Sequence, residues 1–229
     1  PFMDKIQVKC SKCGKLVSRI EPVGSPWLDA GIVPFSTLLD PKTGKPSHTT
    51  DKKYFKKWYP ADLITESFPG QFKNWFYSLI AMSTVLENKN PFKNVLGFAT
   101  ALSEKGKPMH KSDGTSIEFN KAADEIGVDV MRWLYARQNP ERNLLFGYNT
   151  TNEVKRHFHM FLWNSYRFFV NYAALEDWQP TKDQPTKNIL DQWILARLDQ
   201  MVLKVTNGLD KFNTFSGAKA IEDFVTDFS

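Results

Sequence analysis

Residues 61–102 read ADLITESFPGQFKNWFYSLIAMSTVLENKNPFKNVLGFATAL, and this stretch decides the fold of the first part of the chain. Two apolar segments, 61–65 and 95–102, are typical of buried strands. Between them, apolar residues recur at helical spacing over 72–86: Phe72, Trp75, Phe76, Leu79, Ile80 and Leu86. Strand, helix and strand in this order predict a βαβ unit, with a parallel sheet and a right-handed crossover.

The segments before this unit are shorter and more mixed. The apolar run at residues 23–28 predicts a further strand. Residues 40–57 are polar, contain Pro41, Gly44 and Pro46, and end in a run of lysines. This composition favours a surface loop.

The chain becomes irregular after residue 104 and helical after residue 150. Glu104 opens a turn of charged residues and glycine, and residues 129–137 form a short helix that Pro140 ends. Three amphipathic stripes follow in 151–229, which predicts the start of an antiparallel bundle. We therefore expect an α/β region at 1–104, an irregular region at 105–150 and an all-α region at 151–229. The last stripe still runs at Ser229, so we expect the sequence to be part of a longer protein.

Composition limits the class of protein. Hydrophobic residues make up 41% and charged residues 24%, as in packed globular proteins. The net charge of +5 is compatible with a nucleic-acid partner without requiring one. No apolar run approaches the roughly 18 residues of a membrane span, and no signal peptide opens the sequence. The sequence predicts a cytoplasmic monomer with no membrane segment.

The segment most informative about function is GKPMHKSDG at residues 106–114. Its two glycines flank a cationic loop. The compact ammonium of Lys111 suits a phosphate, and the Ser112 hydroxyl and backbone N–H groups add donors. Taken alone, these residues favour a solvated basic loop over a phosphate site.

This loop resembles the Lys-Met-Ser-Lys-Ser signature of the class I aminoacyl-tRNA synthetases. Met109, Lys111 and Ser112 match it, whereas Pro108 replaces its first lysine and His110 its first serine. Some isoleucine enzymes of this class carry the same Met-His-Lys-Ser sequence.

Other segments resemble the same family in the same order. Residues 27–31, WLDAG, resemble a Trp-Phe-Asp-Ser-Gly motif of the isoleucine, valine and leucine enzymes. Residues 61–76 resemble the segment that holds the aminoacyl-adenylate, although residues 67–71 are one residue longer than usual. Phe98 stands near a position where many relatives have a histidine. Residues 162–168 and 191–195 resemble the first helices of the anticodon-binding domain.

The resemblance implies a fold and a reaction. The fold would be the C-terminal part of a Rossmann-type catalytic domain, a stem-contact region with the Lys111 loop, and the start of an anticodon-binding bundle. The reaction would be activation of isoleucine by ATP with Mg²⁺, followed by transfer to tRNA(Ile). A valine–tRNA ligase and a non-catalytic tRNA-binding module are the alternatives.

The same resemblance assigns roles to residues. Lys111 would act on the departing pyrophosphate, within an ATP-binding loop of Met109, His110, Lys111 and Ser112. The adenylate would be bound by Glu66 and Gln71, and the amino-acid pocket would be formed by Trp27, Asp29 and Trp75. No His-Ile-Gly-His signature occurs in the sequence, so we expect the other ATP-binding element outside this chain.

Cys10 and Cys13, the only cysteines, have the spacing of half a zinc knuckle. A structural zinc needs four ligands, so Zn²⁺ here would require two more from elsewhere. The alternative is a pair of free thiols in a reducing compartment.

Overall fold

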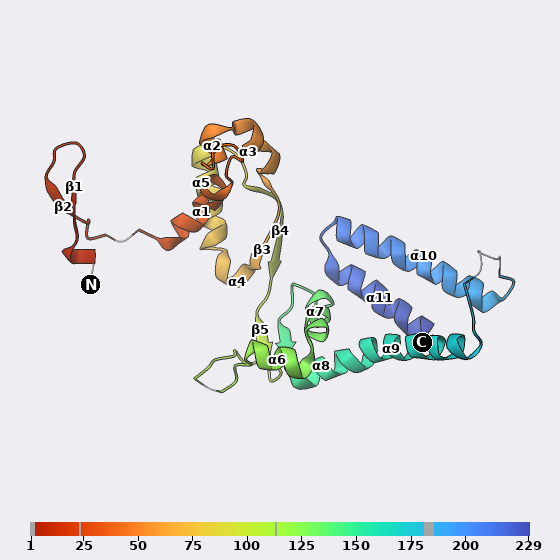
Figure 1. Ribbon diagram of the computed structural model, residues 1–229. Coiled ribbons are helices and arrows are strands. Elements are labelled where there is room, and N and C mark those ends of the chain that lie inside the picture. The colour runs from red at the N-terminus through yellow and green to blue at the C-terminus, as the bar shows by residue number, and fades with distance from the viewer. Residues whose placement is uncertain (1–2, 23, 113, 181–185) are drawn as a thin grey trace. The chain divides into compact units, whose positions relative to one another are not determined.

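The computed structural model describes residues 3–22, 24–112, 114–180 and 186–229 (Figure 1). The chain forms two compact units. Unit 1 contains Pro1–Ile64 and Gly70–Val95, and unit 2 contains Thr65–Pro69 and Leu96–Ser229. The division expected at residues 104 and 150 stays a prediction.

Unit 1 begins with a short hairpin. A 3-10 turn, η1 (Met3–Lys5), precedes β1 (Gln7–Lys9), which pairs antiparallel with β2 (Leu16–Ser18). The connecting turn contains both cysteines and closes through Gly14, which has a φ of 72°. A residue with a side chain adopts this left-handed backbone only at a cost, so glycine suits the position.

Helix α1 (Pro26–Thr37) replaces the strand expected at residues 23–28, so that prediction was wrong; Val23 itself lies outside the described residues. The Ser25 hydroxyl accepts a hydrogen bond from the Trp27 N–H, and Pro26 occupies the first helical position. A serine cap followed by proline is a helix start, and here it prevails over the apolar character of the segment.

The prediction of a surface loop at 40–57 was also wrong, because most of this segment is helical. Helices α2 (Ser47–Thr50) and α3 (Lys52–Trp58) occupy it, and Asp51 caps α3 by accepting from the Tyr54 N–H. Phe55 is 1% exposed and stacks on Tyr59, and both pack with Phe35. The lysines of α3 are exposed, and their number makes the segment polar in composition although Phe55 is buried.

The βαβ arrangement predicted for residues 61–102 is present. Strand β3 (Ala61–Ser67) is the hydrogen-bonded neighbour of β4 (Phe92–Phe98), and α4 (Phe68–Gln71) and α5 (Trp75–Glu87) connect them. The expected last strand is divided, since β5 (Ala101–Ser103) belongs to another sheet. Ile64, Phe76 and Leu79 form the buried cluster between strand and helix.

Unit 2 is built around the parallel pair of β5 and β6 (Leu144–Phe146). The short helices α6 (Phe119–Ile126), α7 (Val128–Ala136) and α8 (Tyr148–Val154) pack with this pair. The helix expected at 129–137 is thus confirmed as α7. Its core is one apolar cluster of buried residues: Ala122, Ile126, Val130, Met131, Leu134, Leu144, Phe146 and Val154.

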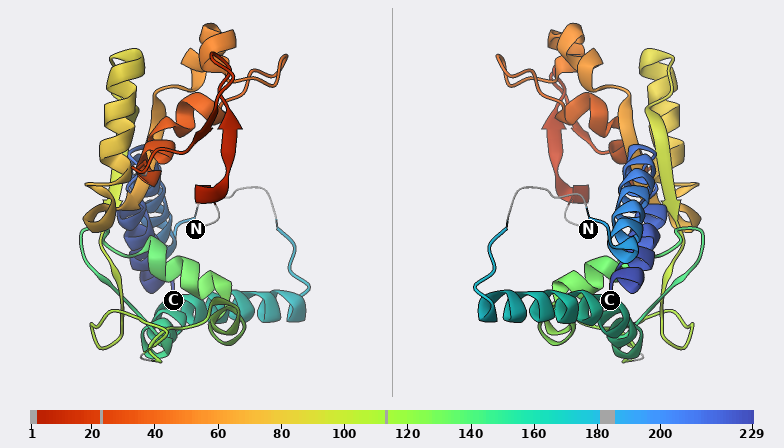
Figure 2. Two further views of the ribbon diagram at one scale, coloured as in Figure 1. Left: turned by 90° about the vertical axis from the view of Figure 1, so that its left-hand side faces the viewer. Right: turned by 90° about the vertical axis from the view of Figure 1, so that its right-hand side faces the viewer.

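The end of the chain is helical, as expected. A π-helical turn, η2 (Lys155–His159), leads into α9 (Met160–Leu175), and then α10 (Ile189–Asp210) and α11 (Thr214–Phe228) pack side by side (Figure 2). Glu222 of α11 accepts from the Trp133 indole N–H at 2.9 Å and pairs with Arg137 at 3.1 Å, which attaches α11 to α7. Within the described residues, no helix combines the length and apolar character needed to cross a bilayer.

The close packing of α1 on α5 generates a prediction about Gly31. A Cβ at this position would lie 2.6 Å from the Ser78 carbonyl oxygen, closer than side-chain carbons approach backbone. Helix propensity alone would make Gly31→Ala stabilising by roughly 1 kcal/mol. We expect instead a loss of about 1–3 kcal/mol in the free energy of unfolding, because the helices must separate.

Urea unfolding of Gly31→Ala tests this, with Gly24→Ala as control, because nothing lies within 4 Å of a Cβ at residue 24. A Gly31→Ala variant as stable as the parent chain would show that the two helices adjust freely.

Candidate functional site

The loop at residues 106–114 starts from a rigid stem at the end of β5. The Gly106 N–H donates to the Ser103 carbonyl at 2.8 Å, and the Ser103 N–H donates to the Lys107 carbonyl at 2.9 Å. The Ser103 hydroxyl donates to the same Lys107 carbonyl. Gly106 has a φ of 71°, a conformation that favours glycine in such a tight turn.

The far side of the loop is held by packing. Met109 and Ile117 are partly buried against the apolar core of unit 2. The His110 N–H donates to the Thr115 hydroxyl oxygen at 3.0 Å, which narrows the loop below its tip. Asp113 lies outside the described residues. The loop is therefore anchored on both sides of an exposed tip.

Lys111 lies at that tip and is exposed, as are Lys105 and Lys107. No carboxylate of the described residues forms an ion pair with any of these three lysines. An exposed ammonium can bind an anionic ligand, and lysine is a common phosphate ligand that acts as a point charge. The structure thus presents Met109, His110, Lys111 and Ser112 together, with Met109 as anchor and Lys111 at the tip.

In the part of the chain that the structure describes, the two residues expected at the adenylate hydrogen-bond to residues close to them in sequence. Glu66 is half-buried near the end of β3, where its Oε1 accepts from the Ser67 N–H at 2.8 Å. Gln71 ends α4, and its Oε1 accepts from the Trp75 N–H at 3.4 Å. Each side chain thus helps fix the backbone of the segment that connects β3 to α5.

Of the residues expected at the amino-acid pocket, Trp75 lines a described cavity of unit 1. This apolar cavity has a volume of about 210 Å³, and Ile64, Leu79 and Val33 also line it. Trp27 is not among its described lining residues, and Asp29 is exposed in the first turn of α1. A carboxylate there favours the positive end of the helix dipole, which is a structural role.

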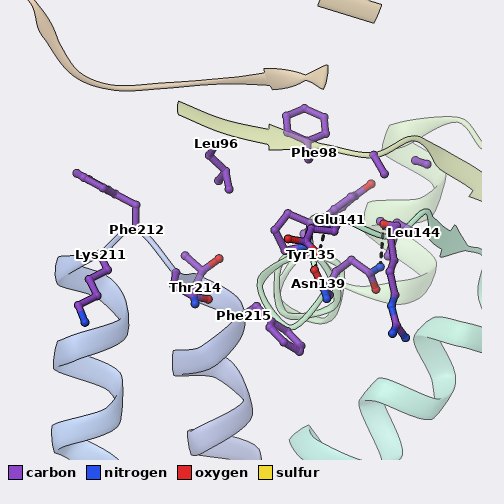
Figure 3. Close-up of a pocket in the computed structure, with 16 residues that line it drawn as sticks. Leu96, Phe98, Tyr135, Asn139, Glu141, Leu144, Lys211, Phe212, Thr214 and Phe215 are labelled. Atoms are coloured by element: carbon purple, nitrogen blue, oxygen red, sulfur yellow. Dashed lines mark hydrogen bonds between the residues drawn. The ribbon is translucent and has the colours of Figure 1, made fainter. Parts of the chain in front are cut away.

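A larger cavity, of about 690 Å³, lies in unit 2 (Figure 3). Its walls come from β4 and β5, from the loop after α7, and from the turn between α10 and α11, where Phe212 has a φ of 56°. Its walls are distant in the chain, so no local sequence pattern pointed to this cavity. The lining residues that Figure 3 labels are Leu96, Phe98, Tyr135, Asn139, Glu141, Leu144, Lys211, Phe212, Thr214 and Phe215.

Cys10 and Cys13 lie in the turn of the β1–β2 hairpin, and backbone N–H groups of this turn point at the Cys10 sulfur. Backbone N–H groups of Cys13 and Lys12 donate to the Cys10 sulfur and lower the pKa of its thiol. Such N–H donation favours the thiolate, the form that binds metal. Within the described residues, however, no third histidine, cysteine or carboxylate joins the pair. These residues supply half of a tetrahedral zinc site and do not fit a complete one.

Comparison with known proteins identifies the class. A family model described as class I tRNA synthetases (I, L, M and V) matches residues 3–146, which contain the βαβ unit, the Lys111 loop and β6. The chain belongs to this family.

Curated relatives of the chain include isoleucine–tRNA ligases. The isoleucine–tRNA ligases of Clostridium tetani and Clostridium acetobutylicum are each 34% identical to this chain over 232 residues. The match covers 100% of the chain and 22% of either ligase. The chain therefore spans about a fifth of the length of these relatives.

A solved structure supports the fold. The leucyl-tRNA synthetase of Agrobacterium radiobacter K84, solved in a ternary complex with tRNA and LeuAMS, matches with a TM-score of 0.74. The match covers 96% of this chain and 29% of that one, at 17% identity. The α/β region followed by helices is therefore the fold of a class I synthetase.

The hairpin turn predicts an acidic Cys10. Since N–H donation lowers its pKa, the Cys10 thiolate persists to lower pH in the folded chain than in the unfolded chain. We expect the pH midpoint of iodoacetamide alkylation, measured in Cys13→Ser, to be lower in buffer than in about 8 M urea, which unfolds the chain. Serine at 13 keeps the backbone donors. Equal midpoints in both solvents would show that the turn does not stabilise the thiolate.

Proposed function

We propose that this chain is part of an isoleucine–tRNA ligase, which activates isoleucine with ATP and transfers it to tRNA(Ile). The observation that carries the proposal is the match of the whole chain, at 34% identity, to enzymes named for this reaction. The exposed, doubly anchored Lys111 loop agrees with it, since activation requires a cation at the phosphates of ATP.

The first step is an in-line attack by the isoleucine carboxylate on the α-phosphorus of ATP. The bond from that phosphorus to the bridging oxygen breaks, and pyrophosphate leaves with the negative charge. The Lys111 ammonium would face the β- and γ-phosphates, where this charge grows. Because its attraction is strongest in the transition state, Lys111 would accelerate the step more than it would tighten substrate binding.

Other residues would hold the reactants. Glu66 would accept from the isoleucine ammonium or the adenylate, and Gln71 would hydrogen-bond beside it. Trp75, with Trp27 and Asp29, would form the amino-acid pocket. For Trp75 the proposal is supported by its position on an apolar cavity. For Trp27 and Asp29 the resemblance to the family is the support.

The tRNA would meet the helical part of the chain. Basic side chains recur over residues 155–167, from Lys155 to Arg167, on η2 and α9. Contacts of lysine and arginine with phosphates weaken steeply with salt, so such binding would depend on ionic strength.

Two metal ions are relevant to this proposal, and only one of them takes part in the reaction. Mg²⁺ would accompany ATP as part of the substrate and offset its phosphate charge. A Zn²⁺ at Cys10 and Cys13 would need two further ligands, and the reaction proposed here does not depend on it.

The proposal predicts a rate effect for Lys111→Ala in a full-length ligase that carries this chain. Loss of one preorganised electrostatic contact costs roughly a hundred- to thousand-fold in rate. We expect single-turnover adenylate formation to slow by about this factor, while isoleucine affinity changes little. Lys111→Arg should recover only part of the rate, because a planar guanidinium replaces a compact charge poorly.

Lys105→Ala is the matched control, since Lys105 is an exposed lysine at the base of the same loop. His110→Ser, which restores the commoner family residue, should also cost little. An adenylation rate of Lys111→Ala within a few-fold of the parent would contradict the role proposed for Lys111.

A second prediction concerns the chain alone. It contains no His-Ile-Gly-His sequence, and it spans 22% of its relatives. We expect the purified 229-residue chain to show no isoleucine-dependent exchange of pyrophosphate into ATP, because the other ATP-binding element is missing. Exchange above a control without isoleucine would reveal a complete ATP site within these residues.

A further inference from the structure

Glu104 connects the base of the Lys111 loop to a distant helix. It follows β5 directly and stands two residues before Gly106. Its Oε1 accepts from the Thr150 N–H at 2.6 Å and from the Thr150 hydroxyl at 3.2 Å. Its Oε2 accepts from the Asn149 amide at 3.0 Å. The carboxylate therefore makes several hydrogen bonds with the first turn of α8.

These bonds replace a cap that α8 does not have. The N-cap position is Gly147, which has no side chain to accept from the first turn. Thr150 is the third helical residue, whose N–H an N-cap side chain ordinarily satisfies. Glu104 does this from another part of the chain. Donation from the Thr150 N–H is the main cause that lowers the pKa of Glu104.

Gly147 is also the residue that makes room for Glu104. Gly147 is buried, and a Cβ built on it would overlap the Glu104 Cγ and lie 2.8 Å from Oε2. Its φ of 170° is extended backbone that any residue adopts, so the need for glycine is one of space. Glu104 and Gly147 therefore form a complementary pair.

We propose that Glu104 is a positioning residue for Lys111, because it fastens the stem of the loop to the start of α8. The parallel pairing of β5 with β6 ends at Ser103 and Phe146, so the Glu104 contact extends the connection beyond the last paired residues. The loop stem and the helix leading through η2 to α9 are thereby held as one piece. The functional consequence rests on the proposed function, whereas the physical link does not.

The competing explanation is that Glu104 is only a helix cap. The two explanations differ in what a replacement cap would restore. Gly147→Ser places a cap on α8 itself, since serine is a favoured N-cap residue. In Glu104→Ala/Gly147→Ser the helix is capped again, but the loop stem is no longer fastened to it.

The experiment measures thermal stability and loop mobility in the 229-residue chain. Lys-C cleaves after lysine, and the rate of cleavage at Lys111, relative to the same site in the urea-unfolded chain, reports loop mobility. We expect Glu104→Ala to lower the melting temperature and to speed cleavage at Lys111 about fivefold, the factor that corresponds to one lost cap. Asp51→Ala is the control, because Asp51 caps α3 through the same kind of carboxylate contact. It should leave cleavage at Lys111 unchanged.

The double variant decides between the explanations. We expect Glu104→Ala/Gly147→Ser to regain the melting temperature while cleavage at Lys111 stays fast. If cleavage returns to the parent rate, or if Glu104→Ala leaves it within twofold, Glu104 does not position the loop. If Glu104→Ala does not fold, the recapped double variant alone is compared with the parent chain, and cleavage at Lys111 within twofold of the parent rate overturns the proposal.

A kinetic measurement separates this inference from the proposed function. In a full-length ligase that carries this chain, the double variant should slow single-turnover adenylate formation several-fold at unchanged stability and little-changed isoleucine affinity, as expected for a misplaced cation that acts in the transition state. If Lys111→Ala leaves adenylation unchanged while the cleavage results hold, the proposed role of Lys111 fails and the Glu104 link stands. If Lys111→Ala slows adenylation and cleavage does not respond to Glu104→Ala, the link fails alone.

Discussion

The parallel pairing of β5 with β6 is the interaction on which the candidate site depends. Ala101, Leu102 and Ser103 pair with Leu144, Leu145 and Phe146, and Leu144 and Phe146 are buried in the core of unit 2. One strand ends where the Lys111 loop begins, and the other ends where α8 begins. A strand buried in a core has its register fixed, because a shift of one residue would expose its apolar side chains. The origin of the loop is therefore set by the core.

Regular periodicity made much of the fold predictable. The helical spacing in residues 72–86 indicated α5, and its flanking segments indicated β3 and β4, because these elements bury one face against neighbours close in sequence. The strand predicted for residues 23–28 was wrong because Ser25 and Pro26, a helix cap and a first helical residue, decide the backbone there. The loop predicted for residues 40–57 was wrong for another reason. Phe55 packs on Phe35, which is distant in sequence and which no local pattern connects to it.

The Lys111 loop is recognisable from the sequence as a cationic loop, whereas the contacts that hold it in place are not. The glycines and lysines of 106–114 mark a cationic loop by composition alone. The burial of Met109 depends on a core assembled from later helices. The use of Glu104 as a cap for α8 depends on the strand pairing that brings residues 104 and 147 together. The cavity of unit 2 likewise joins three separate segments, so no window of sequence contains it.

The last helices show what amphipathic patterning leaves open. Residues 151–229 carry three such stripes, yet their burial differs. Helix α11 buries Ala218, Ala220 and Val225, since α10 and α7 lie against it. Helix α9 has no buried residue among those described. Its large aromatic side chains Trp163, Phe168 and Tyr172 are each more than half exposed. Periodicity identifies the face of a helix that is stable when covered. It does not identify the element that packs on this face. Burial depends on two surfaces, and the sequence pattern of a helix describes only its own.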